Sequence, residues 1–397
     1  MKAIVLNGSS RNSLAIIRSL ANQNFLIDTV VYISNDNIID SYNLKYKSKY
    51  VKFIHFIERN QDEVNEIVSI LKNEKYDFLF AGGTHQSNLI SKHKIQFSKY
   101  TKVVSEDYSK VSLVHNKKRC GELIKSLGIR VPSTFYVKNK NELVEITKKL
   151  KGKAIVKHPD SYNSHGLVLF KGDEDKMIND YIRIFGFDYL EDNFPLIQQV
   201  INGQLHDSTA FSVNGDTVAV LSQKRLMTSW LHGGGGIINI TTNEDVIKNY
   251  TRLILKEINW NGHIEIDWIK DSITGEFYFI EINPKFWGTT QLTISAGYDF
   301  PFWNILMING KEINATENYK VGLKYRWLED EIVTIAKYSK GWEHLKNWLI
   351  FFIRFFSFKT KTSIYLIDIK PFIGFFKLNF LFVLITYYSK LKLSLKK

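Results

Sequence analysis

The chain has 397 residues and contains a single cysteine, Cys120. One cysteine excludes a disulfide framework and any zinc site built from several cysteines, and it favours a reducing compartment. The apolar run at the start of the chain ends at Gly8 and is too short for a signal peptide. We therefore expect this run to be a first β-strand and the bulk of the chain to be cytoplasmic. Cys120 falls inside a helix predicted over 114–127 and is expected to be a core residue.

A complete glycine-rich dinucleotide motif is also missing. A strand at Lys2–Leu6, a helix at 14–22 and a strand at Asp28–Ile33 predict a Rossmann-like start, but the first loop has one glycine. Dinucleotide binding is therefore poorly supported, and residues 1–110 are expected to form a small α/β domain. In this domain Ser9–Arg11 either hold an anion at the helix N-terminus or form a connecting turn. His85 is expected to be structural rather than catalytic.

Positive charge is unevenly distributed along the chain. The net charge is +13, and residues 341–397 contain ten Lys or Arg and two acidic residues. The longest uncharged run in this region, 378–389, has 12 residues, whereas a spanning helix needs about 20. An apolar helical stripe is predicted at Leu345, Trp348, Leu349, Phe352 and Phe356. Aromatics mixed with lysine favour a helix lying on anionic lipid, with packing on the body, a sister subunit or a true anchor as alternatives.

Residues 261–289 predict a β-hairpin that carries several acidic side chains. A turn centred on Ile273 would place Glu265 opposite Glu281, with Asn283 two residues further on the same face. His263 and Asp267 would share the face of Glu265, and Phe277 and Phe279 that of Glu281. Two carboxylates and an amide oxygen form an all-oxygen site, which suits Mg²⁺ or Mn²⁺. The alternative is two acids facing solvent on an edge hairpin.

Between these regions lie several candidate anion-binding segments. Lys157 ends a short buried strand, KAIVK, and precedes a small-residue loop at 159–166 that could cover phosphates. Asn214-Gly215 predicts a type I′ turn between strands 204–213 and 216–223, with Lys224 and Arg225 at the end of the second strand. Four glycines at 233–236 are expected to form a mobile lid or a backbone cradle for an anion.

Taken together, these pieces resemble the ATP-grasp superfamily, and more narrowly its carboxylate–amine ligase-like branch. The resemblance covers residues 1–320. Its strongest piece is IEI…FYFIEINPKFWGT, followed by AGYDFP, and it also includes NKK…LGIRVP, AIVKHPD…SHG and IQQVING with Asp207 four residues beyond the glycine. Each piece is short, but all five occur in the family's order and spacing.

The resemblance implies a role for each matching residue. Lys117 and Lys157 would hold the α- and β-phosphates, and the loop with Ser164, His165 and Gly166 would close over the triphosphate. The inter-lobe hinge that reads adenine would be Gln198, Gln199, Val200 and Ile201. Asp207 would bind the ribose hydroxyls, and Lys224 and Arg225 would face the transferred phosphate or the carboxylate. Glu265, Glu281 and Asn283 would hold one or two Mg²⁺ ions. Lys285 stands where arginine is usual, in a catalytic position near the acyl group.

The implied fold is α/β (α+β), with a Rossmann-like pre-ATP-grasp domain at 1–110 and a two-lobed ATP-grasp domain at 111–320. The lobes would divide near residue 195, and 321–397 would be a basic, aromatic extension. The implied activity is ATP-dependent activation of a carboxylate as an acyl phosphate, followed by its joining to an amine. A bicarbonate-using enzyme of the biotin carboxylase or carbamoyl-phosphate type and a non-catalytic ATP-binding protein remain alternatives.

The expected substrates are small or lipid- or glycan-linked acids and amines, with ATP and Mg²⁺ as cofactors. Nucleic acid is not expected as a partner, because basicity is concentrated in the tail. The expected location is the cytoplasm, peripheral at the inner face of the membrane, and a homo-oligomer is left open.

Overall fold

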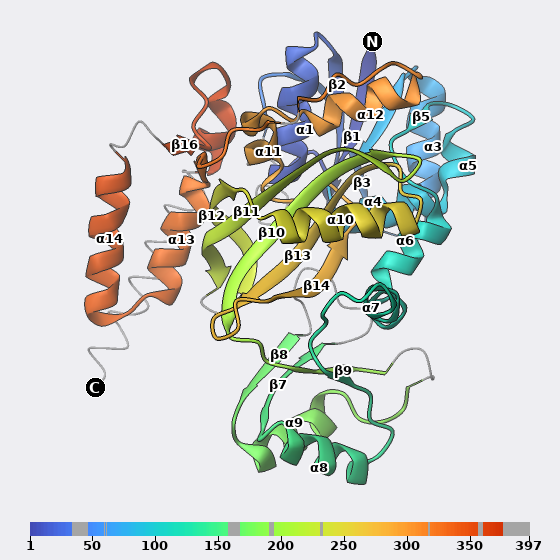
Figure 1. Ribbon diagram of the computed structural model, residues 1–397. Helices are drawn as coiled ribbons and strands as arrows, with labels where there is room; N and C mark the ends of the chain where they lie inside the picture. Colours follow the sequence, from blue (N-terminus) through green and yellow to red (C-terminus); the bar gives the residue numbers. More distant parts are fainter. Residues whose placement is uncertain are drawn as a thin grey trace.

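The computed structural model describes residues 1–33, 47–58, 60, 62–157, 167–189, 194–230, 233–316, 318–355 and 360–375. Three β-sheets follow one another along the chain (Figure 1). The predicted phosphate-covering loop, with Ser164, His165 and Gly166, lies outside the described residues.

The first sheet is parallel, with strand order β3-β2-β1-β4-β5. Its strands are β1 (Lys2–Leu6), β2 (Leu26–Ile33), β3 (Val51–Glu58), β4 (Phe78–Ala81) and β5 (Lys102–Val103). Its helices are α1 (Arg11–Asn22), α3 (Glu63–Asn73), α4 (Thr84–Lys92) and α5 (Lys94–Phe97). Helix α1 begins three residues before the predicted start, because the Ser10 side chain caps it by accepting from the amide of Ser13.

The second sheet is antiparallel, with order β6-β9-β7-β8, and lies at the bottom of Figure 1. Its strands are β6 (Thr134–Phe135), β7 (Lys153–Lys157), β8 (Leu167–Lys171) and β9 (Leu196–Gln199), covered by α8 (Lys140–Lys149) and α9 (Glu174–Ile184). Two helices precede it, α6 (Tyr108–His115) and α7 (Lys117–Ser126). The sequence predicted one helix over 114–127. The chain breaks at Asn116, whose side chain caps α7.

The third and largest sheet has the order β14-β13-β10-β11-β12-β15-β16. Its strands are β10 (Gly203–Val213), β11 (Asp216–Trp230), β12 (Gly233–Thr242), β13 (Gly262–Asp271), β14 (Phe277–Asn283), β15 (Lys324–Arg326) and β16 (Thr360–Thr362). Side chains alternate between its faces. Ala210, Ile264 and Trp268 pack towards α10 (Asp245–Glu257). Phe211 and Leu221 pack on the other side with the first sheet and α12 (Phe300–Ile308).

Strands β11 and β12 differ from the sequence-based predictions. Asn214 and Gly215 have positive φ angles of 51° and 80°, as a type I′ turn requires. Strand β11, however, continues to Trp230, so that Lys224 and Arg225 lie within the strand. The glycines at 233–236 begin β12 and pair with β11, so they are not a lid or a free anion cradle. Pairing with a neighbouring strand outweighs the weak strand propensity of glycine.

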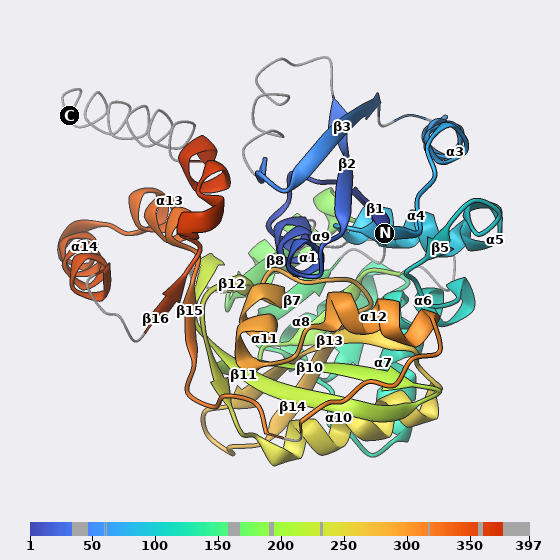
Figure 2. The ribbon, with the colours of Figure 1, turned by 90° about the horizontal axis from the view of Figure 1, so that it is seen from above.

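The C-terminal extension is built onto this sheet. It contributes β15 and β16 to the sheet, and between them lie α13 (Leu328–Tyr338) and α14 (Gly341–Phe355). A 3₁₀ turn at Leu366–Asp368 follows β16, and residues 370–375 are helical. Asp368 is buried and accepts from Arg18 Nε at 2.9 Å and Ser48 Oγ at 2.8 Å, which fastens the extension to the first domain. Figure 2 shows this extension at one side of the molecule. No helix in the described part of the chain is long and apolar enough to cross a membrane.

Candidate active site

The acidic hairpin forms, with a register shifted from the predicted one. Asp267 lies opposite Glu281, and Glu265 lies opposite Asn283. The predicted pairing of Glu265 with Glu281 is wrong, because the loop centre falls half a residue later and a β-bulge follows Asp267. The bulge also turns Phe279 into the core against Trp268, with ring centroids 5.8 Å apart. Phe277 joins the same core, so neither phenylalanine shares the face of Glu281.

Three buried carboxylates converge on one face of the large sheet. Oxygen atoms of Asp207, Glu265 and Asp267 lie within 4.8 Å of one another. Asp207 and Asp267 are direct partners across β10 and β13. The Asn283 amide donates to Asp267 Oδ1 at 3.5 Å, which adds the end of β14 to the group. The sequence did not identify Asp267 as a ligand, although it sits two residues from Glu265 on the same face.

Arg225 is the cation that holds these acids together. Its Nε donates to Asp207 Oδ2 at 3.2 Å, its Nη2 contacts Asp207 Oδ1, and Nη2 lies 2.7 Å from Asp267 Oδ2. Its Nη1 donates to the Gly234 carbonyl at 3.1 Å. Burial alone would lower the pKa of Arg225, but Asp207 and Asp267 raise that pKa well above its usual value. Arg225 is therefore charged and committed to this cluster.

One arginine does not neutralise three acids. Burial, together with Asp267 and Asp207, raises the pKa of Glu265 well above its usual value, although Arg225 and Lys285 oppose the rise. Burial also raises the pKa of Asp267, against the effect of Arg225. The ionised forms of Glu265 and Asp267 are therefore disfavoured in this site, and a divalent cation would stabilise them. The donor set fits Mg²⁺ or Mn²⁺, because every candidate ligand atom is oxygen.

Lysine residues from both lobes surround the acids. Lys157 is buried at the end of β7, where burial lowers the pKa of its ammonium group against the opposing effects of Glu281 and Asp267. Burial, Lys285 and Lys117 lower the pKa of His115 to about 4, whereas Glu281 opposes this. Lys157 and Lys285 therefore act on acids of the hairpin, and Lys117 acts on His115, which Glu281 also influences.

The predicted hinge connects the two lobes. Gln198 and Gln199 end β9, and Val200 and Ile201 lead directly to β10 at Gly203. The Gln199 amide donates to the Ser133 carbonyl at 2.9 Å, and Gln198 Nε2 donates to Thr134 Oγ1 at 2.9 Å. Beside the hinge, strand alternation turns the half-buried Ile155, Leu167 and Leu169 away from the small-lobe core. This leaves an apolar surface next to the hinge backbone, suited to a flat aromatic group.

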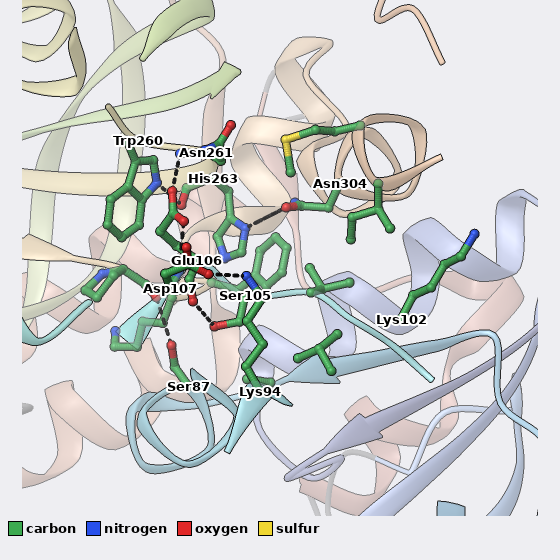
Figure 3. Close-up of a pocket in the computed structure, with 18 of the residues that line it drawn as sticks. Ser87, Lys94, Lys102, Ser105, Glu106, Asp107, Trp260, Asn261, His263 and Asn304 are labelled. Carbon is green, nitrogen blue, oxygen red and sulfur yellow. Dashed lines mark hydrogen bonds and ion pairs between the residues drawn. The ribbon is translucent and has the colours of Figure 1, made fainter. Parts of the chain in front are cut away.

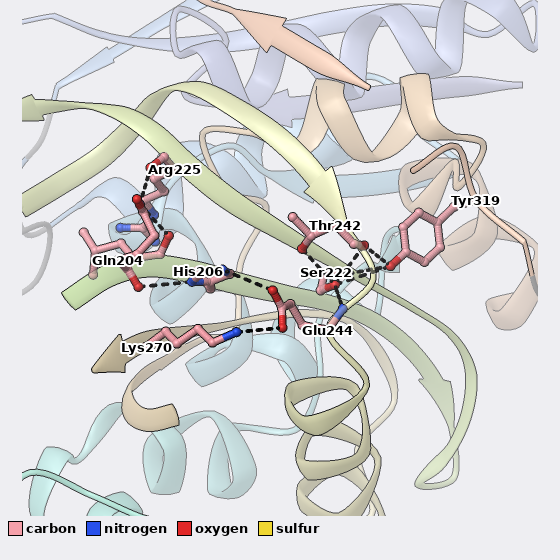
Figure 4. Close-up of polar contacts among 9 residues, drawn as sticks. Gln204, His206, Ser222, Arg225, Thr242, Glu244, Lys270 and Tyr319 are labelled. Atoms are coloured by element: carbon pink, nitrogen blue, oxygen red, sulfur yellow. Dashed lines mark hydrogen bonds and ion pairs between the residues drawn. The ribbon is translucent and has the colours of Figure 1, made fainter. Parts of the chain in front are cut away.

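Lys224 is not brought to the acidic cluster. It pairs with His206 across β10 and β11, on the face opposite that of Arg225. On this face His206 lies 3.7 Å from Glu244 and Lys270 lies 3.3 Å from Glu244, as Figure 4 shows. The prediction that Lys224 faces the transferred phosphate is therefore wrong. Neighbouring residues of a strand point to opposite faces of the sheet, and of these two residues Arg225 points towards the acids. Asp207, which was predicted to bind the ribose hydroxyls, accepts hydrogen bonds from Arg225 and Gln223 and so lies within the acidic cluster.

A pocket of about 590 Å³ lies between the first domain and the large lobe (Figure 3). Lys285 belongs to its lining. His263 forms part of the wall, stacked on Phe286 at 3.6 Å and accepting from Asn304 Nδ2 at 3.1 Å. Burial lowers the pKa of His263 to about 4, so its ring is neutral. Glu106 accepts from the amide of Asn261 at 2.6 Å. No local sequence pattern predicted this pocket, because its residues come from separate segments of the chain.

Known proteins resemble this chain in sequence and in fold. Residues 114–289 match a family model described as an ATP-grasp domain. An uncharacterised protein of Methanocaldococcus jannaschii is 23% identical over 355 residues, which cover 86% of this chain and 82% of that protein.

Two groups of solved structures share the fold. The biotin carboxylase domain of 2-oxoglutarate carboxylase from Hydrogenobacter thermophilus, a complex with MgADP, ADP and bicarbonate, has a TM-score of 0.65 at 14% identity and covers 81% of this chain and 73% of its own. N5-carboxyaminoimidazole synthetase from Staphylococcus aureus, complexed with ADP, has a TM-score of 0.60 at 14% identity and covers 83% of both chains. These likenesses confirm the predicted fold class.

Proposed function

We propose that this chain, a member of the ATP-grasp superfamily, is an ATP-dependent ligase that activates a carboxylate and joins it to an amine. The observation that carries the proposal is the position of the acidic cluster, on the large-lobe sheet opposite Lys157 of the small lobe. Acids on one lobe and lysines on both surround the place where phosphates would lie. The fold relatives bound to ADP support a nucleotide-binding role.

Nucleotide binding would use both lobes. The adenine ring would pack on the apolar surface of Ile155, Leu167 and Leu169, next to the peptide edges of Gln199 to Ile201. Lys157 and Lys117 would contact phosphate oxygens, since a buried ammonium group gains most from an anionic partner. Asp267, Glu281 and Asn283 would hold Mg²⁺, with Glu265 and Asp207 adjacent. Mg²⁺ would supply charge neutralisation of the phosphate oxygens.

The proposed chemistry has two balanced steps. A carboxylate oxygen of the acid attacks the γ-phosphorus of ATP, and the bond to the β,γ-bridging oxygen breaks to release ADP. The amine nitrogen then attacks the acyl carbon, a C–N bond forms, the C–O bond to phosphate breaks, and the amine loses a proton. Bringing two anions together is the main electrostatic obstacle, and Arg225 and Lys285, which already act on the acids of the cluster, would reduce it.

The second substrate would occupy the pocket beside Lys285. This pocket offers neutral His263, Asn304 and Glu106 as polar groups. Lys285 lines the pocket and also opposes the rise in the pKa values of Glu265 and Asp267, so its side chain links the pocket to the acids. A nucleophile bound here would reach the acyl group from the side of Lys285.

Mg·ATP-dependent ADP release tests the proposal. Purified protein is incubated with a panel of amino, hydroxy and uronic acids, with hydroxylamine as a small nucleophile that traps acyl phosphates as hydroxamates. We expect one acid class to give both ADP and hydroxamate. Carbonate-dependent ADP release without any organic acid would instead support the bicarbonate-using alternative. ATP binding with no turnover on any acid would support a non-catalytic role.

A further inference from the structure

Helix α14 is apolar on two sides, and the structure separates them. Phe351 is 6% exposed and packs with Leu328 and Ile335 of α13, while the Arg326 guanidinium lies 5.3 Å from its ring centroid. These contacts hold the helix on the body. Trp348 belongs to this inner side, although the sequence assigned it to the same stripe as Leu345 and Phe352.

The outer side of α14 remains uncovered. Exposed fractions range from 55% to 87% for five large apolar side chains: Trp342, Leu345, Leu349, Phe352 and Ile353. Nearby in the extension, Leu366 and Ile367 are 87% and 71% exposed. Helix α14 and the 366–375 segment lie at the same edge of the molecule in both ribbon views (Figures 1 and 2). Single exposed apolar residues are ordinary, but a cluster of this kind marks an interaction surface.

Charge around this cluster indicates its partner. Lys337, Lys340, Lys346 and Arg354 lie in or beside the helix. Residues 341–397 contain two acids, and one of them, Asp368, is buried in an ion pair with Arg18. Glu343 is thus the acid that faces outward in this region. An apolar strip flanked by excess positive charge complements an anionic lipid surface, in which side chains enter the acyl boundary and lysines meet headgroups.

We propose that Trp342, Leu345, Leu349, Phe352 and Ile353 of α14, together with Leu366 and Ile367, dock this protein on an anionic membrane surface. The inference is independent of the proposed ligase activity. It also narrows the predicted membrane contact of the tail to one side of α14. The inner side of this helix packs on the body, and the outer side contacts lipid.

Vesicle flotation of the full chain tests this. Two kinds of vesicle are compared. One contains phosphatidylcholine with about 30% phosphatidylglycerol, which makes its surface anionic, and the other contains phosphatidylcholine alone. We expect flotation with the anionic vesicles, weakened by salt. The triple variant Leu345→Gln, Leu349→Gln, Phe352→Gln should reduce the bound fraction roughly tenfold or more, because binding scales with buried apolar area.

A matched control removes equally exposed apolar side chains elsewhere. Ile95, Ile273 and Val321 are 84%, 90% and 58% exposed, and their triple glutamine variant should float like wild type. Circular dichroism and thermal unfolding confirm that both triple variants are folded. Undiminished flotation of the α14 variant, or equal binding to both vesicle types, would overturn the proposal. A wild-type dimer that the α14 variant dissociates, without flotation of either, would assign the face to self-association instead.

Discussion

Asp267 and Glu281 face each other directly across β13 and β14, immediately before the bulge that turns Phe279 into the core. Like charges in direct cross-strand pairs are unfavourable. Arg225 forms an ion pair with Asp267, and Asp267 and Glu281 both oppose the lowering of the Lys157 pKa by burial. The pair is therefore the point at which the two lobes meet electrostatically.

Replacing Asp267 by asparagine should weaken Mn²⁺·ATP binding roughly tenfold or more and lower turnover ~100-fold, because one ligand charge is lost. Glu281→Gln should behave in the same way, and Glu265→Gln should have a smaller effect, since Glu265 lies opposite Asn283. Electron paramagnetic resonance of Mn²⁺ measures binding without requiring activity. Asp216→Asn, at an exposed position in the β10–β11 hairpin, is the control. A larger effect at Glu265 than at Asp267 would contradict this assignment.

Lys157 is buried at the end of β7. Lys157→Gln should weaken ATP binding ~10-fold or more while leaving adenosine binding unchanged, because a charged contact with phosphate is lost. Lys148→Gln, at an exposed position of α8, should leave both affinities at the wild-type level. Isothermal titration calorimetry with the two ligands makes the comparison. Equal losses for ATP and adenosine would show that Lys157 supports the fold of the lobe instead.

Arg225→Met should lower the free energy of unfolding by about 3–5 kcal/mol, since Asp207 and Asp267 would remain buried without their cation. Adding Asp207→Asn to that variant should recover part of the loss, because one of the two uncompensated charges is removed. Urea unfolding of wild type, both single variants and the double variant gives the coupling energy. If the losses of stability in the two single variants simply add up in the double variant, Arg225 and Asp207 are not energetically coupled.

The C-terminal extension carries a group that makes stability depend on pH. Burial and the neighbouring Asp330 raise the pKa of Glu329 to about 7, against a hydrogen bond from Ser363. The folded protein therefore holds this proton more tightly than the unfolded chain. The stabilisation is complete below pH 4.5 and is lost as pH rises towards 7, up to about 3 kcal/mol.

Glu329→Gln should remove this dependence. Relative to wild type, the variant should gain stability between pH 5 and pH 8, which urea unfolding at the two pH values measures. Glu257→Gln, in the last turn of α10 on the surface, serves as the control. If wild type and the Glu329→Gln variant differ in free energy of unfolding by the same amount at both pH values, Glu329 is ionised in the folded protein.

Local sequence patterns were sufficient for the elements of this fold. The alternation of side chains identified β13 and β14, the Asn214-Gly215 pair identified their neighbouring hairpin, and the apolar run at the start identified β1. The order of the motifs pointed to the ATP-grasp domain, whose family model matches residues 114–289, since each motif depends on residues close together in the chain. The acidic hairpin was predicted for the same reason, and it forms.

The tertiary structure decided which acids meet and which basic residue joins them. No local sequence pattern predicted the β-bulge, and with it the cross-strand partner of Glu281 is Asp267 rather than Glu265. The length of β11 placed Arg225 in the site and Lys224 behind it. The inner and outer sides of α14 became distinct only when α13 was packed against it. Register, strand extent and helix burial depend on contacts between distant segments, and a one-residue change in any of them exchanges the faces of a strand.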